Sequence, residues 1–500
     1  MCLLICSYAE GQFGPARGGE QPKAQPLPLS GRTESGSVAP AQTPVAGGAN
    51  SVNTINPSIQ VQGSYQGSTQ SGQVTAQALM LTLADAVQRG IRYNLGSIGA
   101  GDAAQLARAR RLAAVAELLP NINGQVQETA QQIDLAAEGL RISVPIPGFH
   151  FPTVVGPFNY FDARASLSEG VSLTTLQNIR ASREDERSAQ LTLKDSRELV
   201  TLAVVGSYLQ IIAAAARIQT ANAQIQSAQA VYDQAVDRNR SGLNARIDVT
   251  RSLVELQTQR QRLTSLTNDF EKQKIAMARL IGMPMAQAFT LADAIPFREL
   301  PAPDVNAQIQ RALTNRADLQ AASAQVKAAQ QARAAAAAEH LPSVNVTGDY
   351  GAIGVNPSQS HGTFSVTGAV QFPIYTSGRI RADIDQADAT LAQRRAEYED
   401  AKGRAEQDVR DAVLDLDAAA QQVRVAQSNR ELAADALDQA RDRFRAGVSD
   451  TVELVQAQET VATAEQDYIN STFAFNLAQV SLARATGDIE QSVPRLVTGR

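Results

Sequence analysis

The sequence predicts a mainly α-helical protein with a small β component, built from one structural unit that occurs twice. Three observations support this fold class. A glycine turn, Asp-Arg-Asn-Arg-Ser-Gly-Leu at residues 237–243, returns 205 residues later as Asp-Arg-Phe-Arg-Ala-Gly-Val at 442–448. Proline-free helical sequence runs from about 176 to 240, and four segments alternate apolar and polar side chains. Because an internal repeat determines the architecture as a whole, each half is predicted as helix, strand, strand, long helix, turn and helix.

The repeat also sets the predicted domain boundaries. The same offset relates Gly282 to Gly487, and Glu117-Leu118-Leu119-Pro120 matches Glu339-His340-Leu341-Pro342 earlier in each half. The predicted segments are an N-terminal region (1–80), a first repeat (81–300), a second repeat (301–490) and a C-terminal tail (491–500).

The N-terminal region is predicted to be a linker or tail. Residues 10 to about 78 are rich in Gly, Pro, Ser, Gln and Ala, a composition that buries too little apolar surface to offset chain entropy. Met1 to Cys6 is a short apolar stub without a basic region, so we interpret it as a truncated or atypical signal. Lipidation of a cysteine is the alternative. Within the region, Ile59 to Tyr65 alternates and is a candidate extra strand.

The long helical stretch predicts coiled coils. At 1.5 Å per residue it extends roughly 100 Å, which is wider than a compact domain. Apolar residues step by three and four through Ile218, Ala221, Ile225 and Ala228, and the repeat keeps this phase, apart from Arg430. Two antiparallel coiled-coil hairpins follow from this pattern. No segment is expected to reach the roughly 18 apolar residues of a membrane helix, so any membrane crossing must be by strands.

The four alternating segments predict strands with one apolar and one polar face. Their apolar positions include Phe161, Leu167, Val344, Val346, Phe364, Val366, Val370 and Phe372. The loop within the first pair is expected at about 129–160. Strands of about ten residues suit a tilted membrane crossing. Four strands leave two open edges, which cannot persist in lipid because unpaired backbone groups are costly there, so a barrel would have to be shared between chains.

Composition excludes several classes of function. The net charge is −5 and the arginines are dispersed over helical faces, so no nucleic-acid partner is predicted. Cys2 and Cys6 are the only cysteines, which leaves the predicted body without a thiolate site. The histidines, His150, His340 and His361, lack metal-ligand spacing, and no phosphate loop or nucleophile elbow is present. We therefore predict no cofactor, no metal and no enzymatic activity.

With these features the chain resembles the TolC-type outer membrane efflux proteins over roughly residues 80–490. The duplication, the Leu-Pro before the first strand of each half, the Phe-Pro-Ile-Tyr-Thr-Ser-Gly-Arg passage at 372–379 and the paired glycine turns carry the resemblance. It implies mainly α structure with membrane β: a homotrimer whose twelve strands, four per chain, form one β-barrel on a periplasmic α-helical barrel.

The resemblance also implies a function and partners. The chain would be a passive exit duct in the outer membrane, with a large periplasmic part, for a tripartite efflux pump or a type I secretion system. Its partners would be a periplasmic adaptor, an inner-membrane transporter and outer-membrane lipid. The alternative from the helix pattern is a soluble periplasmic coiled-coil interaction protein, adaptor-like, whose short strands pack as a small sheet.

In the family the helical turns form the periplasmic tip, which the adaptor grips. The implied docking positions are Arg238, Gly242, Leu243, Asp248, Arg443, Gly447 and Val448. A bare helix end needs the same glycine, and Asp248 also fits a helix-start charge, so both alternatives stay open. The family's closed tip carries acidic rings after the second turn, where this chain has Glu453 and Gln456, the predicted periplasmic gate. Three Glu453 side chains around an axis would attract cations; a solvated glutamate is the alternative, and neutral Gln456 offers no second charged ring.

Overall fold

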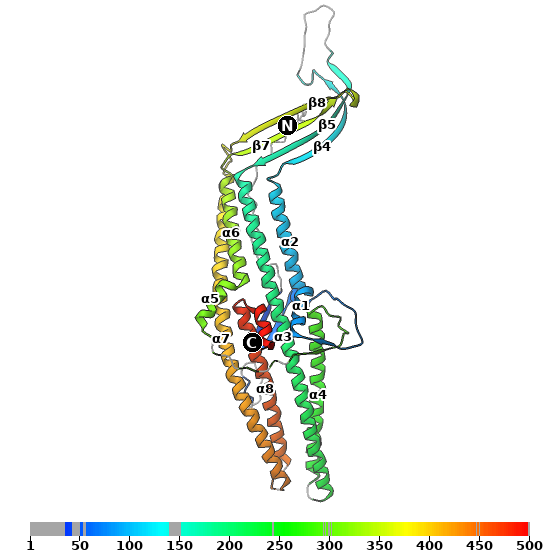
Figure 1. The fold of residues 1–500 in the computed structure, drawn as a ribbon, viewed down its shortest axis with the longest axis vertical. Helices are drawn as coiled ribbons and strands as arrows, with labels where there is room; N and C mark the ends of the chain where they lie inside the picture. The colour runs from blue at the N-terminus through cyan, green and yellow to red at the C-terminus, as the bar shows by residue number, and fades with distance from the viewer. Residues whose placement is uncertain are drawn as a thin grey trace, which may run out of the picture. The chain divides into compact units, whose positions relative to one another are not determined.

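The computed structural model divides the chain into two compact units, each described by itself (Figure 1). The strand unit holds residues 106–186 and 325–395, and the helical unit holds 30–105, 187–324 and 396–500. The residues described are 36–42, 51–53, 57–139, 152–242, 245–293, 295, 297–298, 301, 303–446, 448–449 and 451–498.

The strand unit contains one antiparallel sheet in the order β4-β5-β7-β8. Its strands are β4 (Asn121–Asp134), β5 (Val154–Val171), β7 (Ser343–Gly354) and β8 (His361–Gln371). The central pairing of β5 with β7 joins the two repeats, and Val171 lies opposite Val344. Among the described strands, the outer edges of β4 and β8 have no strand partner.

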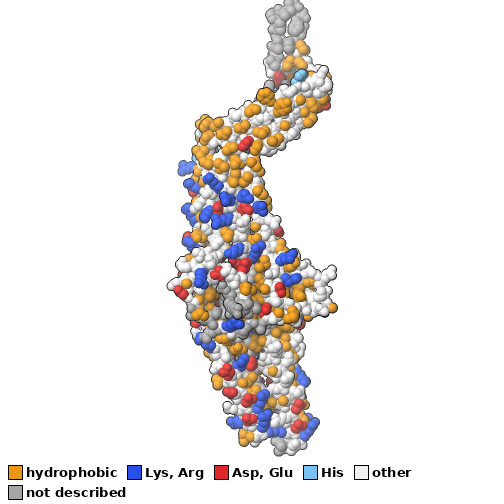
Figure 2. Space-filling view, viewed as in Figure 1, with side chains coloured by type: hydrophobic (Ala, Val, Ile, Leu, Met, Phe, Trp, Pro, Cys, Tyr) orange, Lys and Arg blue, Asp and Glu red, His pale blue; other side chains and the backbone are white. Residues whose placement is uncertain are grey.

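The register confirms the predicted alternation. Ala165 lies opposite Gly124 on one side and Tyr350 on the other, and Tyr350 lies opposite Phe364, so one face collects apolar residues. Ile122 and Phe364 are 69% and 77% exposed, and Figure 2 shows apolar side chains gathered over the sheet. The other face carries mainly Asn, Gln, Ser and Thr, with Asp162, Arg164 and Asp349 joined across β5 and β7.

Two expectations about strand ends were wrong. Phe372 was predicted within the last strand, but β8 ends at Gln371 and Phe372 lies one residue beyond it, 65% exposed. The first pair is longer than predicted, because β4 continues to Asp134 and β5 begins at Val154, with paired residues where a loop was expected. Residues 129–134 of β4 are mostly polar and residues 154–160 of β5 are mostly apolar, so neither extension shows a clear period-two alternation.

Two sequence motifs meet where the strands join helices. Glu339 follows α6 (Ala317–Ala338), and Arg379 begins α7 (Arg379–Arg445). The Arg379 Nη1 donates to Glu339 Oε2 at 2.7 Å and to Asp383 Oδ2 at 2.8 Å. Glu339 is buried, so this ion pair fixes the entry to β7 beside the exit from β8.

The helices of the helical unit repeat with the predicted offset. Adding 205 to the bounds of α4 (Arg246–Leu280) gives those of α8 (Thr451–Ala485), since 246 becomes 451 and 280 becomes 485. Two residues beyond the end of each helix lies a glycine with positive φ, 69° at Gly282 and 78° at Gly487. The next N–H in each case donates 2.9 Å back to the residue five positions earlier, the Schellman closure that glycine permits.

The first helix predicted in each half is in fact two helices. α1 (Leu83–Tyr93) and α2 (Leu95–Ala116) are separated at Asn94, and α5 (Val305–Asn315) and α6 are separated at Arg316. Asn94 is extended, with ψ 134°, and its Nδ2 donates to the Tyr65 carbonyl at 2.7 Å. A tertiary contact therefore interrupts an otherwise helical pattern. A short last helix, α9 (Ile489–Thr498), follows α8.

The core of the helical unit is built on the middle of α3 (Leu173–Arg240). Contrary to expectation, this helix is apolar and long enough to cross a membrane by composition, but 67% of that window is buried inside the protein. Val200, Val204 and Tyr208 are fully buried in a cluster that includes residues of α1, α4, β3 (Leu79–Leu81) and β6 (Phe289–Leu291). The Tyr208 hydroxyl donates to the Leu81 carbonyl at 3.0 Å. We therefore assign this stretch to the protein core.

Part of the predicted tail packs on the helical unit. β1 (Val38–Gln42) pairs with β2 (Pro57–Val61), and a 3-10 turn over Gly63–Gln66 follows, so the candidate strand at 59–65 is only partly a strand. A Cβ added at Gly206 of α3 would lie 2.2 Å from Ile59 Cγ1, which shows how closely the segment approaches. Tyr65 is 3% exposed.

The same segment is held by the buried carboxylate of Asp467 on α8. Asp467 accepts from Ser51 Oγ at 2.9 Å, from the Val52 N–H at 2.9 Å and from Asn53 Nδ2 at 2.7 Å. The Asn53 side-chain oxygen Oδ1 in turn accepts from Gln422 Nε2 of α7 at 2.7 Å. Composition alone could not predict that this segment packs on the helical unit, because four hydrogen bonds hold a segment that has little apolar surface to bury.

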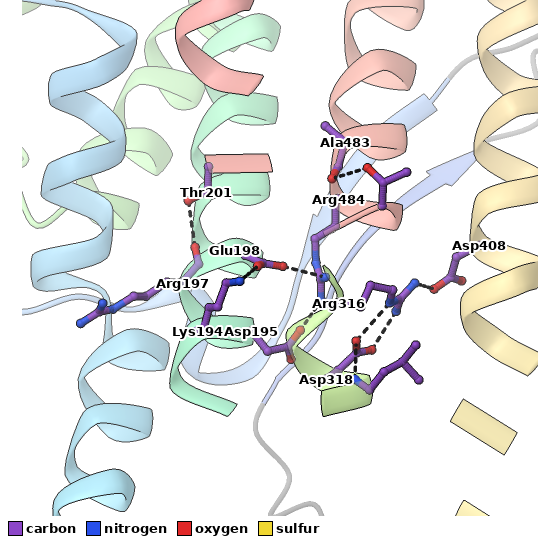
Figure 3. A network of polar contacts seen from close by, with 12 residues as sticks. Lys194, Asp195, Arg197, Glu198, Thr201, Arg316, Asp318, Asp408, Ala483 and Arg484 are labelled. Carbon is purple, nitrogen blue, oxygen red and sulfur yellow. Dashed lines mark hydrogen bonds and ion pairs between the residues drawn. The ribbon is translucent and has the colours of Figure 1, made fainter. Parts of the chain in front are cut away.

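A partly buried network of ion pairs lies inside the helical unit, and its Arg484 pairs join the two repeats (Figure 3). The network consists of Asp195, Glu198, Arg316, Asp318, Asp408 and Arg484. Arg484 of α8 pairs with Asp195 and, at 3.1 Å, with Glu198, both on α3. Arg316 pairs with Asp318 at 2.8 Å and with Asp408 of α7 at 2.7 Å. Burial raises the pKa of Glu198 to about 7 although Arg484 opposes this shift, and burial also raises the pKa of Asp195.

Candidate gate at the helical tip

The first hairpin tip joins α3 to α4. The Gly242 N–H donates to the Asn239 carbonyl at 3.0 Å, and Gly242 has φ 74°, a backbone region that side chains disfavour. Asp248 lies in the first turn of α4, where a negative charge is stabilised by the helix dipole, and is 3.9 Å from Arg251. The predicted docking residue Leu243 lies outside the described residues.

The second tip joins α7 to α8. The Val448 N–H donates to the Arg443 carbonyl at 3.0 Å, and the Val448 side chain is 68% exposed. Gly447 lies outside the described residues. Val448 is thus an apolar side chain presented to solvent, as a docking position requires, and its role in docking remains a prediction.

Glu453 lies in the first turn of α8, the return helix of the second hairpin. Its Oε1 is 3.4 Å from Arg443 Nε, and the two side chains are 41% and 58% exposed. Gln456, one turn later, is exposed. Because the ion pair is exposed, it is weak and screened by salt, and Glu453 can exchange Arg443 for another cation at little cost.

The two tips are joined through Arg238. Its Nη2 donates to the Arg445 carbonyl at 3.1 Å, and its guanidinium lies 4.5 Å from the centroid of the Phe444 ring. Phe444 is 2% exposed and packs with Val231 of α3 and Leu454 of α8. Arg238 was predicted as a docking residue, and in the structure its side chain contacts the second hairpin.

Phe444 was not among the residues predicted at the tip. It occupies the position of Asn239 in the first repeat, since 239 plus 205 is 444, and it is the one large apolar residue gained in the repeated motif. Its spacing of seven from Leu437 and four from Ala440 continues the apolar seam, which is the signal that could have found it.

Further polar contacts join the hairpins along their length. Arg217 Nη2 of α3 donates to Asn470 Oδ1 of α8 at 2.6 Å, and Arg262 Nη2 of α4 donates to Gln466 Oε1 of α8 at 2.7 Å. In each of these contacts, an arginine of the first repeat donates to an uncharged side-chain oxygen on α8. Movement of the second hairpin away from the first would break them in succession.

Comparisons with known proteins show that the chain is similar to outer-membrane channels. Residues 308–488 match the family model for the outer membrane efflux protein. The Pseudomonas aeruginosa "Pyoverdine export outer membrane protein OpmQ" is 26% identical over 322 residues, which is 64% of this chain and 66% of OpmQ. The Escherichia coli "Cation efflux system protein CusC" is 22% identical over 333 residues, covering 64% of this chain and 72% of CusC.

The fold is shared with solved channels. The Campylobacter jejuni CmeC outer membrane channel superimposes with a TM-score of 0.71 at 15% identity, over 87% of this chain and 95% of that chain. The match to OpmQ spans about two thirds of that protein (66%). The resemblance drawn from the duplication, the strand pairs and the glycine turns is therefore confirmed.

Proposed function

We infer that this chain, which belongs to the TolC-type outer membrane efflux protein family, is an outer-membrane channel and the exit duct of a tripartite efflux pump or type I secretion system. It conducts passively, and energy comes from an inner-membrane transporter that a periplasmic adaptor links to the helical tip. The relatives are named for export of pyoverdine and of cations, so cargo is set by the transporter rather than by the duct.

The observation that carries this proposal is the four-stranded sheet with one apolar face and two unpartnered outer edges. In lipid such edges are costly, because no water satisfies the exposed N–H and C=O groups. Three copies supply twelve strands, with β4 of one subunit beside β8 of the next, and remove every edge. The exposed Ile122, Val126, Phe364 and Val366 then face lipid, and the polar face lines the lumen.

The helical tip supports the gate assignment. Arg238 holds the second hairpin through Phe444 and the Arg445 carbonyl, and Glu453 lies in the first turn beyond that tip. We propose that opening moves the second hairpins outward, breaking the Arg238 contacts and separating three Glu453 carboxylates. Before opening, those carboxylates repel anions at the narrowest point.

Fractionation and conductance test the function. The full-length chain should sediment with outer membranes and give a trimer by native mass spectrometry in detergent. Purified protein should form discrete conductance steps in planar bilayers. The alternative, a soluble periplasmic coiled-coil protein, is not favoured by the comparisons with known channels. Release of a detergent-free monomer by osmotic shock, without pore activity, would restore it.

A further inference from the structure

A cavity of about 380 Å³ lies between the two hairpins of the helical unit. Residues of four helices, α3, α4, α7 and α8, line it, so its walls come from both repeats. The cavity volume falls within the range of small-molecule sites. It is distinct from the Glu453 turn, which does not line it.

Three polar side chains of the cavity wall donate hydrogen bonds to other residues of the wall. Arg441 Nη2 donates to Ser227 Oγ at 2.7 Å, and Gln458 Nε2 donates to the same oxygen at 2.8 Å. Gln259 Nε2 donates to Glu255 Oε1 at 2.7 Å. Each of these three side chains thus uses N–H groups in hydrogen bonds to other residues of the wall.

Two buried acceptors of the wall have no donor within the described part of the chain. The Gln259 side chain belongs to a residue that is 6% exposed, and its Oε1 has no hydrogen-bond partner among the described residues. The Oε1 of Gln458 is buried in the same way. A buried acceptor without a donor is unfavourable, so the site favours an occupant that brings N–H groups.

Charge and apolar surface define that occupant further. The carboxylates of Glu255 and Glu465 and the guanidinium of Arg441 are the charged groups of the lining. Arg441 is engaged with Ser227 and, at 3.3 Å, with Asp438, and Glu465 lies 3.9 Å from Arg430, a half-exposed cation outside the lining. Two acids and one base leave the lining with one negative charge. Leu437 and Val461 supply apolar wall.

We propose that this cavity binds a small organic ammonium ion with an apolar body. Its N–H groups donate to the amide oxygens of Gln259 and Gln458, its charge is balanced by Glu255 and Glu465, and its body packs against Leu437 and Val461. A bound ion touches both hairpins and therefore favours their present spacing. This last consequence rests on the proposed gate, whereas binding itself does not.

The probe for the experiment is benzylammonium, with benzyl alcohol and benzoate as neutral and anionic analogues of similar shape. Binding to the full-length trimer in detergent is measured by ligand-observed NMR. A Kd of about 1 mM is expected for a ligand of this size. Benzyl alcohol should bind at least about tenfold more weakly, because it carries no charge and one donor, and benzoate should not bind. Equal binding of the three would overturn the proposal.

Variants locate the site. Glu255→Gln and Glu465→Gln should each weaken benzylammonium binding by about fivefold, from the loss of one partly screened charge. Ala223→Phe, on the exposed part of the lining, should abolish it by filling the cavity. Glu459→Gln is the matched control, since Glu459 is an exposed acid of α8 that does not line the cavity.

The outcomes separate binding from gating. If Ala223→Phe perturbs the trimer, as judged by size exclusion and circular dichroism, Gln259→Leu replaces it, and undiminished binding by Gln259→Leu refutes the site. Benzylammonium should also lower the open probability in planar bilayers at saturating concentration. Binding without that change would keep the site and remove its link to the gate. Failure to form pores at all would refute the channel function and leave the binding result standing.

Discussion

The Arg484 guanidinium donates to the Glu198 carboxylate at 3.1 Å, joining α8 to the buried middle of α3 (Figure 3). The Glu198 side chain is 2% exposed. Desolvation disfavours its charge, and Arg484 recovers only part of the cost, so the pKa of Glu198 rises from 4.5 to about 7.

Stability should therefore fall as the pH rises toward neutrality. Between pH 4.5 and about 7 the folded chain keeps a proton on Glu198 that the unfolded chain has released, so the free energy of unfolding decreases across this window and levels off above it. Glu198→Gln should match the wild type near pH 4.5, and at pH 8 its free energy of unfolding should be higher than that of the wild type by at most about 3 kcal/mol. Circular dichroism melts measure this. Exposed Glu459→Gln should keep the wild-type profile, and an unchanged pH slope in Glu198→Gln would contradict the assignment.

Arg238→Ala should favour the open channel. The substitution removes the hydrogen bond to the Arg445 carbonyl and the contact with the Phe444 ring. Together these are worth about 1–2 kcal/mol, so the opening equilibrium should shift by about tenfold. Arg240→Ala is the control, because Arg240 is 77% exposed and lies 3.7 Å from Asp237 on its own helix. Equal open probabilities for the two variants in planar bilayers would show that the Arg238 contacts do not hold the channel closed.

Glu453→Ala should raise single-channel conductance or lower cation preference, because the three carboxylates are then absent from the tip. Gln456→Glu should do the reverse, since it adds a second acidic position one turn later. Reversal potentials in a salt gradient measure the preference. Glu431→Ala, an exposed acid of α7, is the control. The gate assignment fails if neither variant at the tip changes conductance or selectivity.

Asp467→Ala should release the N-terminal segment. The carboxylate accepts three hydrogen bonds from residues 51–53, and their loss leaves the buried Asn53 short of a partner. A cost of about 3 kcal/mol is expected, which exposes the segment to proteases. Limited proteolysis should cut N-terminal to residue 57 faster than in Asp417→Ala, where the exposed carboxylate accepts from Gln421 at 2.8 Å. Equal cleavage would show that apolar contacts alone hold the segment.

Local signals predicted most of the helical and strand architecture. The repeat offset, the heptad seam and the period-two strands each lie within a few residues or at one fixed spacing, so they can be read without tertiary information. The bounds of α4 and α8 differ by the 205 residues expected from Gly282 and Gly487. The tip was located for the same reason, because turns need glycine where φ is positive.

The missed features depend on distant partners. Asp467 and Asn53 are 414 residues apart, and nothing near Asn53 distinguishes it from the other polar residues of the segment. Likewise the helical sequence pattern continues through Asn94. The helix nevertheless breaks there, because the Asn94 side chain donates a hydrogen bond to the distant Tyr65 carbonyl. The apolar run in α3 shows the opposite case, in which local composition suits a membrane helix and only its burial assigns it to the core.

The return helices of the two hairpins, α4 and α8, are both 35 residues long, so the two hairpins of one chain are similar. In the trimer proposed above, three chains would present six similar hairpins, so a partner with sixfold order would meet each of them in a similar way. Phe444, which stands where the first repeat has Asn239, is one position at which the two hairpins of a chain differ. Such differences would lower the order to threefold and would let alternate hairpins move while the others stay in place.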